Sequence, residues 1–223
     1  MTEFLTHSAV KLALHTLRDA SKDTKDEPKL LLLHGLGEHA PKHVPEQFNT
    51  WPGSIYALDF TGHGESTVPR GGGYTAELLM SDADIALAKL GKVTVAGRGI
   101  GAYVAVLLAG GRPEFVRGTI LMDGPGLAGG GSGSTSPFIV FPDMTQMTPP
   151  DPFALAELSV DVRPPDYVLE FVRLAGQYSD LSRPFSICCE EKPDWLTAML
   201  EHPGVETVNL EEALNYYASL SDN

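Results

Sequence analysis

A glycine-rich turn joins a β-branched stretch that begins at Val93 to an apolar stretch that runs on past Ala105. The turn reads Gly97-Arg98-Gly99-Ile100-Gly101. A serine at the centre of a G-x-S-x-G turn between a strand and a helix is a nucleophile for acyl carbons. Gly99 occupies that central position, and glycine has no side chain with which to attack. The segment therefore has the local arrangement for acyl transfer without its nucleophile.

Acyl hydrolysis also needs a base, a carboxylate that orients the base, and backbone amides directed at the developing oxyanion. No histidine follows Val205 to Leu210, the last predicted strand, and His202 precedes that strand. Ligand sites in parallel sheets lie at the carboxyl ends of the strands, so His202 is predicted at the opposite edge. The position of the base is thus empty, independently of Gly99.

Three acidic residues are candidates for the orienting carboxylate. Asp194 and Glu191 follow the predicted strand Phe185 to Cys189, and Asp123 ends the strand before it. Each has a structural alternative. Asp194 also suits the first turn of a helix, where a negative charge complements the helix dipole, and Asp123 also begins a Gly-Pro turn.

Other polar residues offer a relocated catalytic set. Glu38 and His39 follow His34, and Cys189 ends a predicted strand at the same edge of the sheet. A cysteine and a histidine can form a nucleophilic pair, although Cys189 also suits a small core position. His34 and His63 are expected more often to orient the backbone of their loops than to move protons. The spacing of His34, Glu38 and His39 matches no metal site, and we predict neither a metal nor a cofactor.

Arg98 lies beside the empty nucleophile position. Its guanidinium can bind a carboxylate in bidentate fashion, or it can face solvent and pair with a surface acid. The sequence leaves both alternatives open.

The elements that must position these residues follow from the apolar patterns. Phe4 to Leu17 alternates as in an antiparallel hairpin at a sheet edge, and short apolar runs typical of buried parallel strands follow. These runs are Leu30 to His34, Ser54 to Asp59, Val93 to Gly97, Gly118 to Asp123, Phe185 to Cys189 and Val205 to Leu210. Helices are predicted at Thr75 to Leu90, Gly101 to Gly110, Pro165 to Tyr178, Pro193 to His202 and Glu211 to Leu220. The alternation predicts one α/β domain over residues 1–223, with a mostly parallel sheet and helices on both faces.

A glycine- and proline-rich segment, residues 126–164, interrupts this alternation. A crossover needs far less chain than this, so we expect a short cap or lid over the sheet. The apolar residues in Phe138 to Phe141 and Phe153 to Leu158 favour a partly ordered cap over a disordered loop.

Three motifs in order resemble the α/β-hydrolase superfamily. His34-Gly35-Leu36-Gly37-Glu38-His39 is similar to the oxyanion loop of these enzymes. The segment from Asp59 to Ser66 is similar to the Gly-His-Gly turn of esterases and monoglyceride-lipase-like members, and the glycine-rich turn to their nucleophile elbow. The resemblance implies an α/β-hydrolase fold.

The resemblance also assigns positions within the site. It places the backbone amides of Leu36 and Ile100 in the oxyanion hole, with His34, Gly35 and Arg98 beside it as ligand-binding residues. Because these amides belong to the backbone, a change of side chain does not remove them. They also form an anion site at a helix N-terminus. The glycine elbow, over Gly97 to about Leu121, resembles that of the non-catalytic N-myc downstream-regulated family. A glycine there relieves the strain of a positive φ.

The composition of the chain disfavours some classes of binding partner. The 16 basic and 29 acidic residues give a net charge of −13, which disfavours nucleic acid and anionic membrane surfaces. No apolar run reaches the roughly 20 residues of a membrane span, and the first residues do not resemble a secretion signal. The only two cysteines, Cys188 and Cys189, are adjacent and unsuited to a disulfide. We expect a cytoplasmic protein.

Three functions remain open. The first is a pseudo-hydrolase that binds a small acyl or carboxylate ligand, or a protein partner, in the cleft beneath the cap, where the resemblance places the catalytic site. The second is a relocated catalytic set that works as a carboxylic-ester hydrolase or a cofactor-free lyase. The third is a structural subunit whose cleft is filled by side chains. We favour them in this order, with enzymatic activity uncertain.

Overall fold

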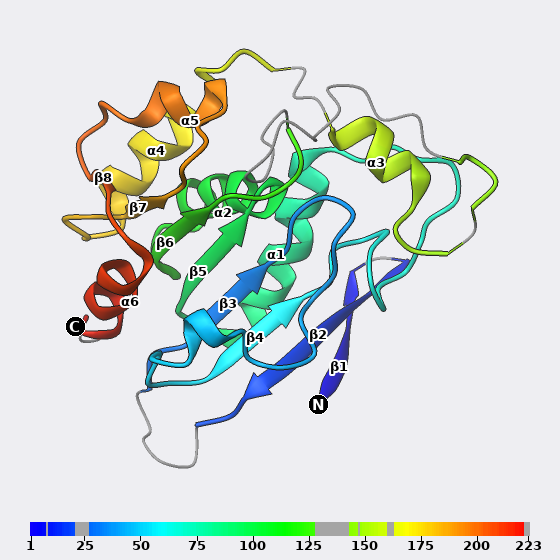
Figure 1. Cartoon of the computed structure of the whole chain (residues 1–223), viewed down its shortest axis with the longest axis horizontal. Helices are drawn as coiled ribbons and strands as arrows, with labels where there is room; N and C mark the ends of the chain where they lie inside the picture. The colour runs from blue at the N-terminus through cyan, green and yellow to red at the C-terminus, as the bar shows by residue number, and fades with distance from the viewer. Residues whose placement is uncertain (8, 21–26, 128–142, 147, 160–162, 221–223) are drawn as a thin grey trace.

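An eight-stranded sheet forms the centre of the computed structural model, which describes residues 1–7, 9–20, 27–127, 143–146, 148–159 and 163–220 (Figure 1). The strand order is β1-β2-β4-β3-β5-β6-β7-β8. The strands are β1 Thr2–His7, β2 Val10–Arg18, β3 Leu30–Leu33, β4 Ile55–Leu58, β5 Val93–Arg98, β6 Val116–Met122, β7 Phe185–Cys188 and β8 Val205–Thr207. The sheet confirms the predicted α/β class.

The first two strands form the predicted hairpin at one edge. β1 pairs with β2 and β2 pairs with β4, both antiparallel, whereas the pairs from β4 to β8 are parallel. Parallel strands end at the same edge of the sheet, so the loops after β3, β4, β5 and β6 are brought together there.

Both faces of the central strands are buried, which explains their continuous apolar runs. Leu31 and Leu33 of β3 pack into a core with α1 Ala76–Leu90, α2 Ile100–Gly111, α4 Tyr167–Tyr178 and α5 Asp194–Met199. Leu30 and Leu32 face the second core, which is covered by the 3-10 helix η1 Glu46–Phe48 and by α6 Leu210–Ala218. Within the described part of the chain, no helix is long and apolar enough to cross a membrane.

Several boundaries differ from the sequence prediction by one to three residues, among them those of β8 and α6. β8 stops at Thr207, three residues before the predicted end, and α6 already begins at Leu210. Asn209 is the reason, because its side chain accepts a hydrogen bond from the backbone N–H of Glu212 (2.8 Å) and so caps the helix. The short helix η1 was not predicted at all.

The predicted cap is described only in part, since residues 128–142, 147 and 160–162, including Phe138 to Phe141, lie outside the described residues. The described part contains α3 Pro152–Leu158, which Asp151 caps by accepting a hydrogen bond from the N–H of Phe153 (3.1 Å). Asp151 also accepts a hydrogen bond from the Tyr74 hydroxyl (2.5 Å) and donates its N–H to the carbonyl of Gly62 (2.8 Å). These bonds hold α3 against the Gly-His-Gly turn.

Candidate functional site

The turn after β5 forms a sharp strand-to-helix elbow. Gly99 has φ 55° and ψ −121°, a conformation that side chains rarely adopt. A Cβ on Gly97 would lie 2.2 Å from the carbonyl oxygen of Gly101, and a Cβ on Gly101 would lie 2.5 Å from that of Leu33. The close approach of β3, β5 and α2 therefore requires glycine at both flanking positions.

The backbone amides of Leu36 and Ile100 converge on one point, but that point is occupied. Both N–H groups donate to the carbonyl oxygen of Pro125, at 2.9 Å and 3.0 Å respectively. The loop after β6 thus places a backbone carbonyl where an oxyanion would have to bind. The resemblance to a hydrolase pairs these two amides, but it gives no sign that the carbonyl of Pro125 is their acceptor.

The loop from Gly124 to Leu127, which we call the plug, also fills the space above the elbow. A Cβ on Gly99 would lie 2.1 Å from the carbonyl oxygen of Pro125 and 2.5 Å from the carbonyl carbon of Gly124. A Cβ on Gly35 would lie 2.6 Å from Cδ of Pro125. The cavity that remains beside Gly99 is about 10 Å³, which is too little for more than one water. The main chain and the Pro125 ring of the plug thus close the cleft in which the first hypothesis places its ligand, and a closed cleft is what the third hypothesis expects.

Of the three candidate carboxylates, two border that small cavity. Asp123 and Glu191 line it, whereas Asp194 is an exposed residue in the first turn of α5. The oxygens of Asp123 accept hydrogen bonds from the N–H groups of Glu190 (2.8 Å) and Glu191 (3.1 Å). Asp123 therefore holds the loop after β7 in place, and no imidazole is bonded to it among the described residues.

No histidine follows β8 in the described part of the chain. β8 is followed by α6, which contains no histidine. His202 precedes β8 and its ring hydrogen-bonds the carbonyl of Pro203 (2.9 Å). It lies at the amino end of β8, away from Gly99.

His34 and His63 hold backbone and are buried next to each other. Nδ1 of His34 donates to the carbonyl of Gly35 (2.7 Å), and its Nε2 accepts from the N–H of Phe60 (3.1 Å). Nδ1 of His63 donates to the carbonyl of Thr61, and its Nε2 accepts from the N–H of Gly37 (3.2 Å). Burial lowers the pKa of both rings, that of His34 to about 3, with His63 contributing. Both rings are neutral and fully bonded, so neither is a free base.

Cys189 is equally unsuited to the relocated set. Its thiol donates to the carbonyl of Leu121 (3.2 Å), and burial raises its pKa to about 12. Neither Cys189 nor His34 is hydrogen-bonded to a carboxylate among the described residues, which removes the relocated set built on them. The described residues also hold no group of three potential metal ligands.

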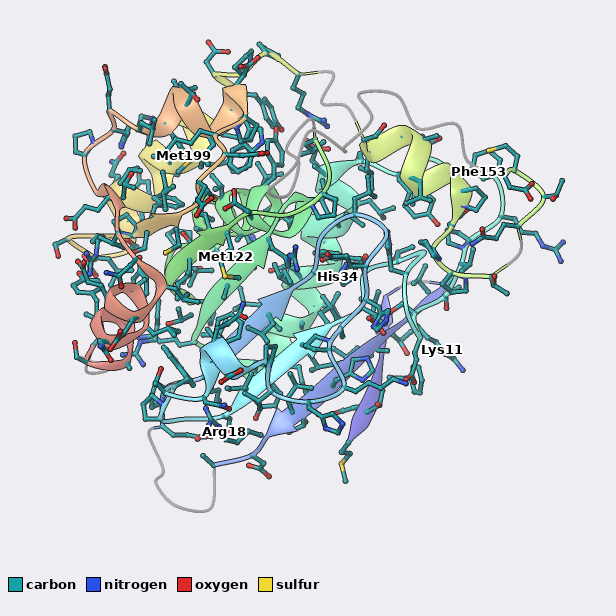
Figure 2. All side chains as sticks on the ribbon, viewed as in Figure 1. Lys11, Arg18, His34, Met122, Phe153 and Met199 are labelled. Atoms are coloured by element: carbon teal, nitrogen blue, oxygen red, sulfur yellow. The ribbon has the colours of Figure 1, made fainter. Side chains whose placement is uncertain are left out.

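Arg98 ends β5 at the mouth of an open cavity. The cavity measures about 550 Å³ and lies on the η1 side of the sheet; Figure 2 shows His34 and Met122, two of its lining residues, near the carboxyl ends of β3 and β6. Its other walls include Leu32, Ala96 and Phe48, so its floor is apolar. Nη2 of Arg98 lies 3.3 Å from Oε1 of Glu38, whose Oε2 accepts the N–H of Gly35 (2.9 Å). Arg98 thus pairs with an acid and also faces a cavity.

The strand order, the elbow after β5 and the two convergent amides define the α/β-hydrolase class of fold. The chain belongs to this class: the model of the alpha/beta hydrolase family matches residues 30–218. A search of curated proteins gave no match.

Solved structures of several hydrolases are similar to part of the chain. A thioesterase domain from the curacin biosynthetic pathway is 21% identical with a TM-score of 0.48, and 55% of this chain matches 45% of that one. An epoxide hydrolase from Vigna radiata is 22% identical (TM-score 0.42; 56% of this chain, 40% of that). Epoxide hydrolase A from Mycobacterium thermoresistibile is 20% identical (TM-score 0.45; 56% and 39%). The matched part spans less than half of each of these structures.

Proposed function

We propose that this protein is a pseudo-hydrolase that binds a small carboxylate or acyl ligand and does not hydrolyse it in the family's cleft. One observation carries the proposal: the Pro125 carbonyl accepts both amides of the oxyanion site, directly above a glycine that has no nucleophile. An ester carbonyl has no place there while the plug is seated. A glycine elbow in an intact fold also resembles the N-myc downstream-regulated family, which fits a non-catalytic role.

The ligand site in this proposal is the cavity beside Arg98, next to the closed cleft. Its volume of about 550 Å³ lies within the range of roughly 300–1,000 Å³ that is usual for small-molecule sites. Apolar walls from Leu32, Ala96 and Phe48 suit an alkyl chain, and Arg98 supplies a cation for its head group. A medium-chain carboxylate combines these two features.

The contact with Glu38 leaves other N–H donors of Arg98 available to a ligand. A guanidinium has five N–H donors, and the described contact engages one nitrogen at 3.3 Å. The Arg98 side chain is 46% exposed and that of Glu38 is 33% exposed. Pairs this exposed contribute roughly 0–1 kcal/mol, so a ligand carboxylate can share or replace Glu38 at small cost.

Calorimetric titration with octanoate tests the site, with octanol as the uncharged comparison. Arg98→Gln should weaken octanoate binding at least about 10-fold, because a hydrogen bond to a charged group contributes about 1.5–3 kcal/mol. Arg112→Gln is the matched control, since Arg112 pairs with Asp84 away from the cavity and should leave affinity unchanged. Equal affinity of Arg98→Gln and wild type would refute the carboxylate site, and no binding to wild type would favour a protein partner instead.

A fluorophosphonate probe tests the closed cleft, and no label should appear on the elbow or the plug. Turnover of an ester that is lost on changing residues of this cleft would refute the pseudo-hydrolase and favour a carboxylic-ester hydrolase.

Cys188 and Cys189 are both free, which supports a reducing compartment, and the proposal places the protein in the cytoplasm.

A further inference from the structure

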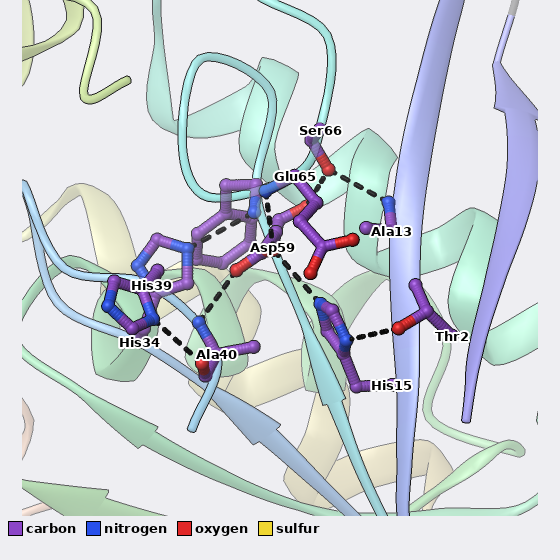
Figure 3. A network of polar contacts seen from close by, with 10 residues as sticks. Thr2, Ala13, His15, His34, His39, Ala40, Asp59, Glu65 and Ser66 are labelled. Atoms are coloured by element: carbon purple, nitrogen blue, oxygen red, sulfur yellow. Dashed lines mark hydrogen bonds and ion pairs between the residues drawn. The ribbon is translucent and has the colours of Figure 1, made fainter. Parts of the chain in front are cut away.

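A hydroxyl, an imidazole and a carboxylate form a continuous chain outside the family's cleft (Figure 3). Oγ1 of Thr2 lies 2.9 Å from Nδ1 of His15, and Nε2 of His15 lies 2.9 Å from Oδ2 of Asp59. This is the order of groups that activates a hydroxyl for attack on an acyl carbon.

The antiparallel hairpin brings the three residues together. Thr2 of β1 stands directly opposite His15 of β2, and His15 stands opposite Ala57, two residues before Asp59. Sequence reasoning missed this set because it treated the hairpin only as a sheet edge. The polar residue His15 within the alternating segment was the available signal.

Asp59 is fixed from two further directions. Its Oδ1 accepts the N–H of Ala40 (2.6 Å), and its Oδ2 also accepts the N–H of Glu65 (2.8 Å). Gly64 has φ 52° and passes so close that a Cβ would lie 2.2 Å from the carboxyl group. The Asp59 side chain is only 3% exposed, so the carboxylate is held rigidly and points at His15.

The hydrogen bonds also determine the tautomer of His15. An ionised carboxylate only accepts hydrogen bonds, so Nε2 of His15 carries the proton that faces Asp59. In the neutral ring Nδ1 then has a free lone pair, which accepts the hydroxyl proton of Thr2. His34 and His63 differ, because their ring nitrogens are bonded to backbone groups alone.

This chain of groups opens to an accessible cavity. Thr2, His15 and Asp59 all line a cavity of about 380 Å³, which lies within the size range of small-molecule sites. Lys42 lines the same cavity and supplies a positive charge that can stabilise an oxyanion.

We propose that Thr2, His15 and Asp59 form a second site that cleaves small short-chain acyl esters. Oγ1 of Thr2 attacks the ester carbonyl while its proton passes to Nδ1 of His15. The ester C–O bond then breaks, and the leaving oxygen takes that proton and departs as the alcohol. Water next attacks the acyl-Thr2 ester and gives its proton to His15; the bond to Oγ1 breaks, Thr2 recovers the proton, and the carboxylic acid leaves.

The experiment incubates the full chain with p-nitrophenyl acetate and maps the acetyl group by peptide mass spectrometry. The expected result is an adduct on Thr2, with p-nitrophenol release that is lost in Thr2→Val and retained in Thr2→Ser. His15→Gln keeps a donor for Asp59 but is a far weaker base, and should slow release about 100-fold or more. Thr6→Val, on the same strand outside the cavity, is the matched control and should behave as wild type.

Two outcomes would overturn the proposal: an adduct confined to lysines or other residues, or equal release by wild type, Thr2→Val and His15→Gln. A purely structural Thr2–His15 pair would change the stability of these variants without changing the mapped adduct. The cavity beside Thr2 shares His39 and Pro41 with the cavity beside Arg98, but Thr2 lines only the former and Arg98 only the latter. Thr2→Val should therefore bind octanoate as wild type does, so that either proposal can fail alone.

Discussion

Replacing Gly99 with serine restores the nucleophile of the family motif, yet we expect it to destabilise the protein without producing hydrolysis. The new Cβ would lie 2.1 Å from the Pro125 carbonyl oxygen, where ordinary contact begins at 3.4 Å. The plug must therefore move by more than 1 Å. That movement weakens the two hydrogen bonds from Leu36 and Ile100 at a cost of about 0.5–1.5 kcal/mol each.

Backbone strain adds to this cost. A side chain in a sparsely populated positive-φ conformation costs about 1–3 kcal/mol. Together these effects give about 2–6 kcal/mol for Gly99→Ser, a large fraction of the 5–15 kcal/mol that is typical of a domain. Urea denaturation followed by circular dichroism measures this loss.

Gly91→Ser separates the two contributions. Gly91 has φ 76° and ψ −143°, close to the backbone conformation of Gly99, but a Cβ there meets nothing within 4 Å. Gly91→Ser should therefore lose only the strain energy. Two results would show that the plug is not seated in solution. One is a Gly99→Ser variant as stable as Gly91→Ser, and the other is a reaction of the introduced hydroxyl with a fluorophosphonate.

Three further predictions concern His34, the two cysteines and two of the candidate carboxylates. Burial lowers the pKa of His34 to about 3 in the folded chain, whereas the imidazole of the unfolded chain titrates near 6.5, so the free energy of unfolding should fall as the pH drops below about 6.5. Urea titrations should show that His34 accounts for a loss of about 2 kcal/mol by pH 5. In His34→Gln the free energy of unfolding should depend less steeply on pH. Because burial raises the pKa of Cys188 to about 11 and that of Cys189 to about 12, both thiols should react with iodoacetamide at pH 8 about 100-fold or more slowly in the folded chain than in urea. Asp123→Ala should lower the free energy of unfolding by about 1–2 kcal/mol through the two backbone amides it accepts, while Asp194→Ala should leave it nearly unchanged; the reverse order would contradict the roles assigned to them.

The centre of the sheet could be predicted because its strands are buried on both faces. Runs such as Leu30 to Leu33 have no polar alternation, and the later runs alternate with helices that have their own apolar pattern. The boundary at Leu210 was missed because one capping side chain, that of Asn209, decides where α6 begins. Capping depends on a single residue, whereas periodicity depends on many.

The candidate site was predictable only where it depends on glycine spacing. Gly97, Gly99 and Gly101 mark the elbow because a Cβ at any of them would overlap backbone. The plug was not predictable, because its contribution is the carbonyl of Pro125, a group that every residue carries. The contact between His15 and Asp59 joins residues 44 apart in sequence, and no local pattern reports it.

The bonds to Pro125 also bear on how such a chain can change during evolution. Three separate crossovers, after β3, β5 and β6, meet at a single oxygen atom. A serine at position 99 alone would bring no activity and would lower stability, and a histidine after β8 alone would have no nucleophile to activate. A working cleft in this chain would also require the plug to move away from the elbow, a change that brings no activity by itself. In the proposed pseudo-hydrolase, the carbonyl of Pro125 therefore ties any hydrolysis in this cleft to a change in a third loop, beyond the elbow and the segment after β8.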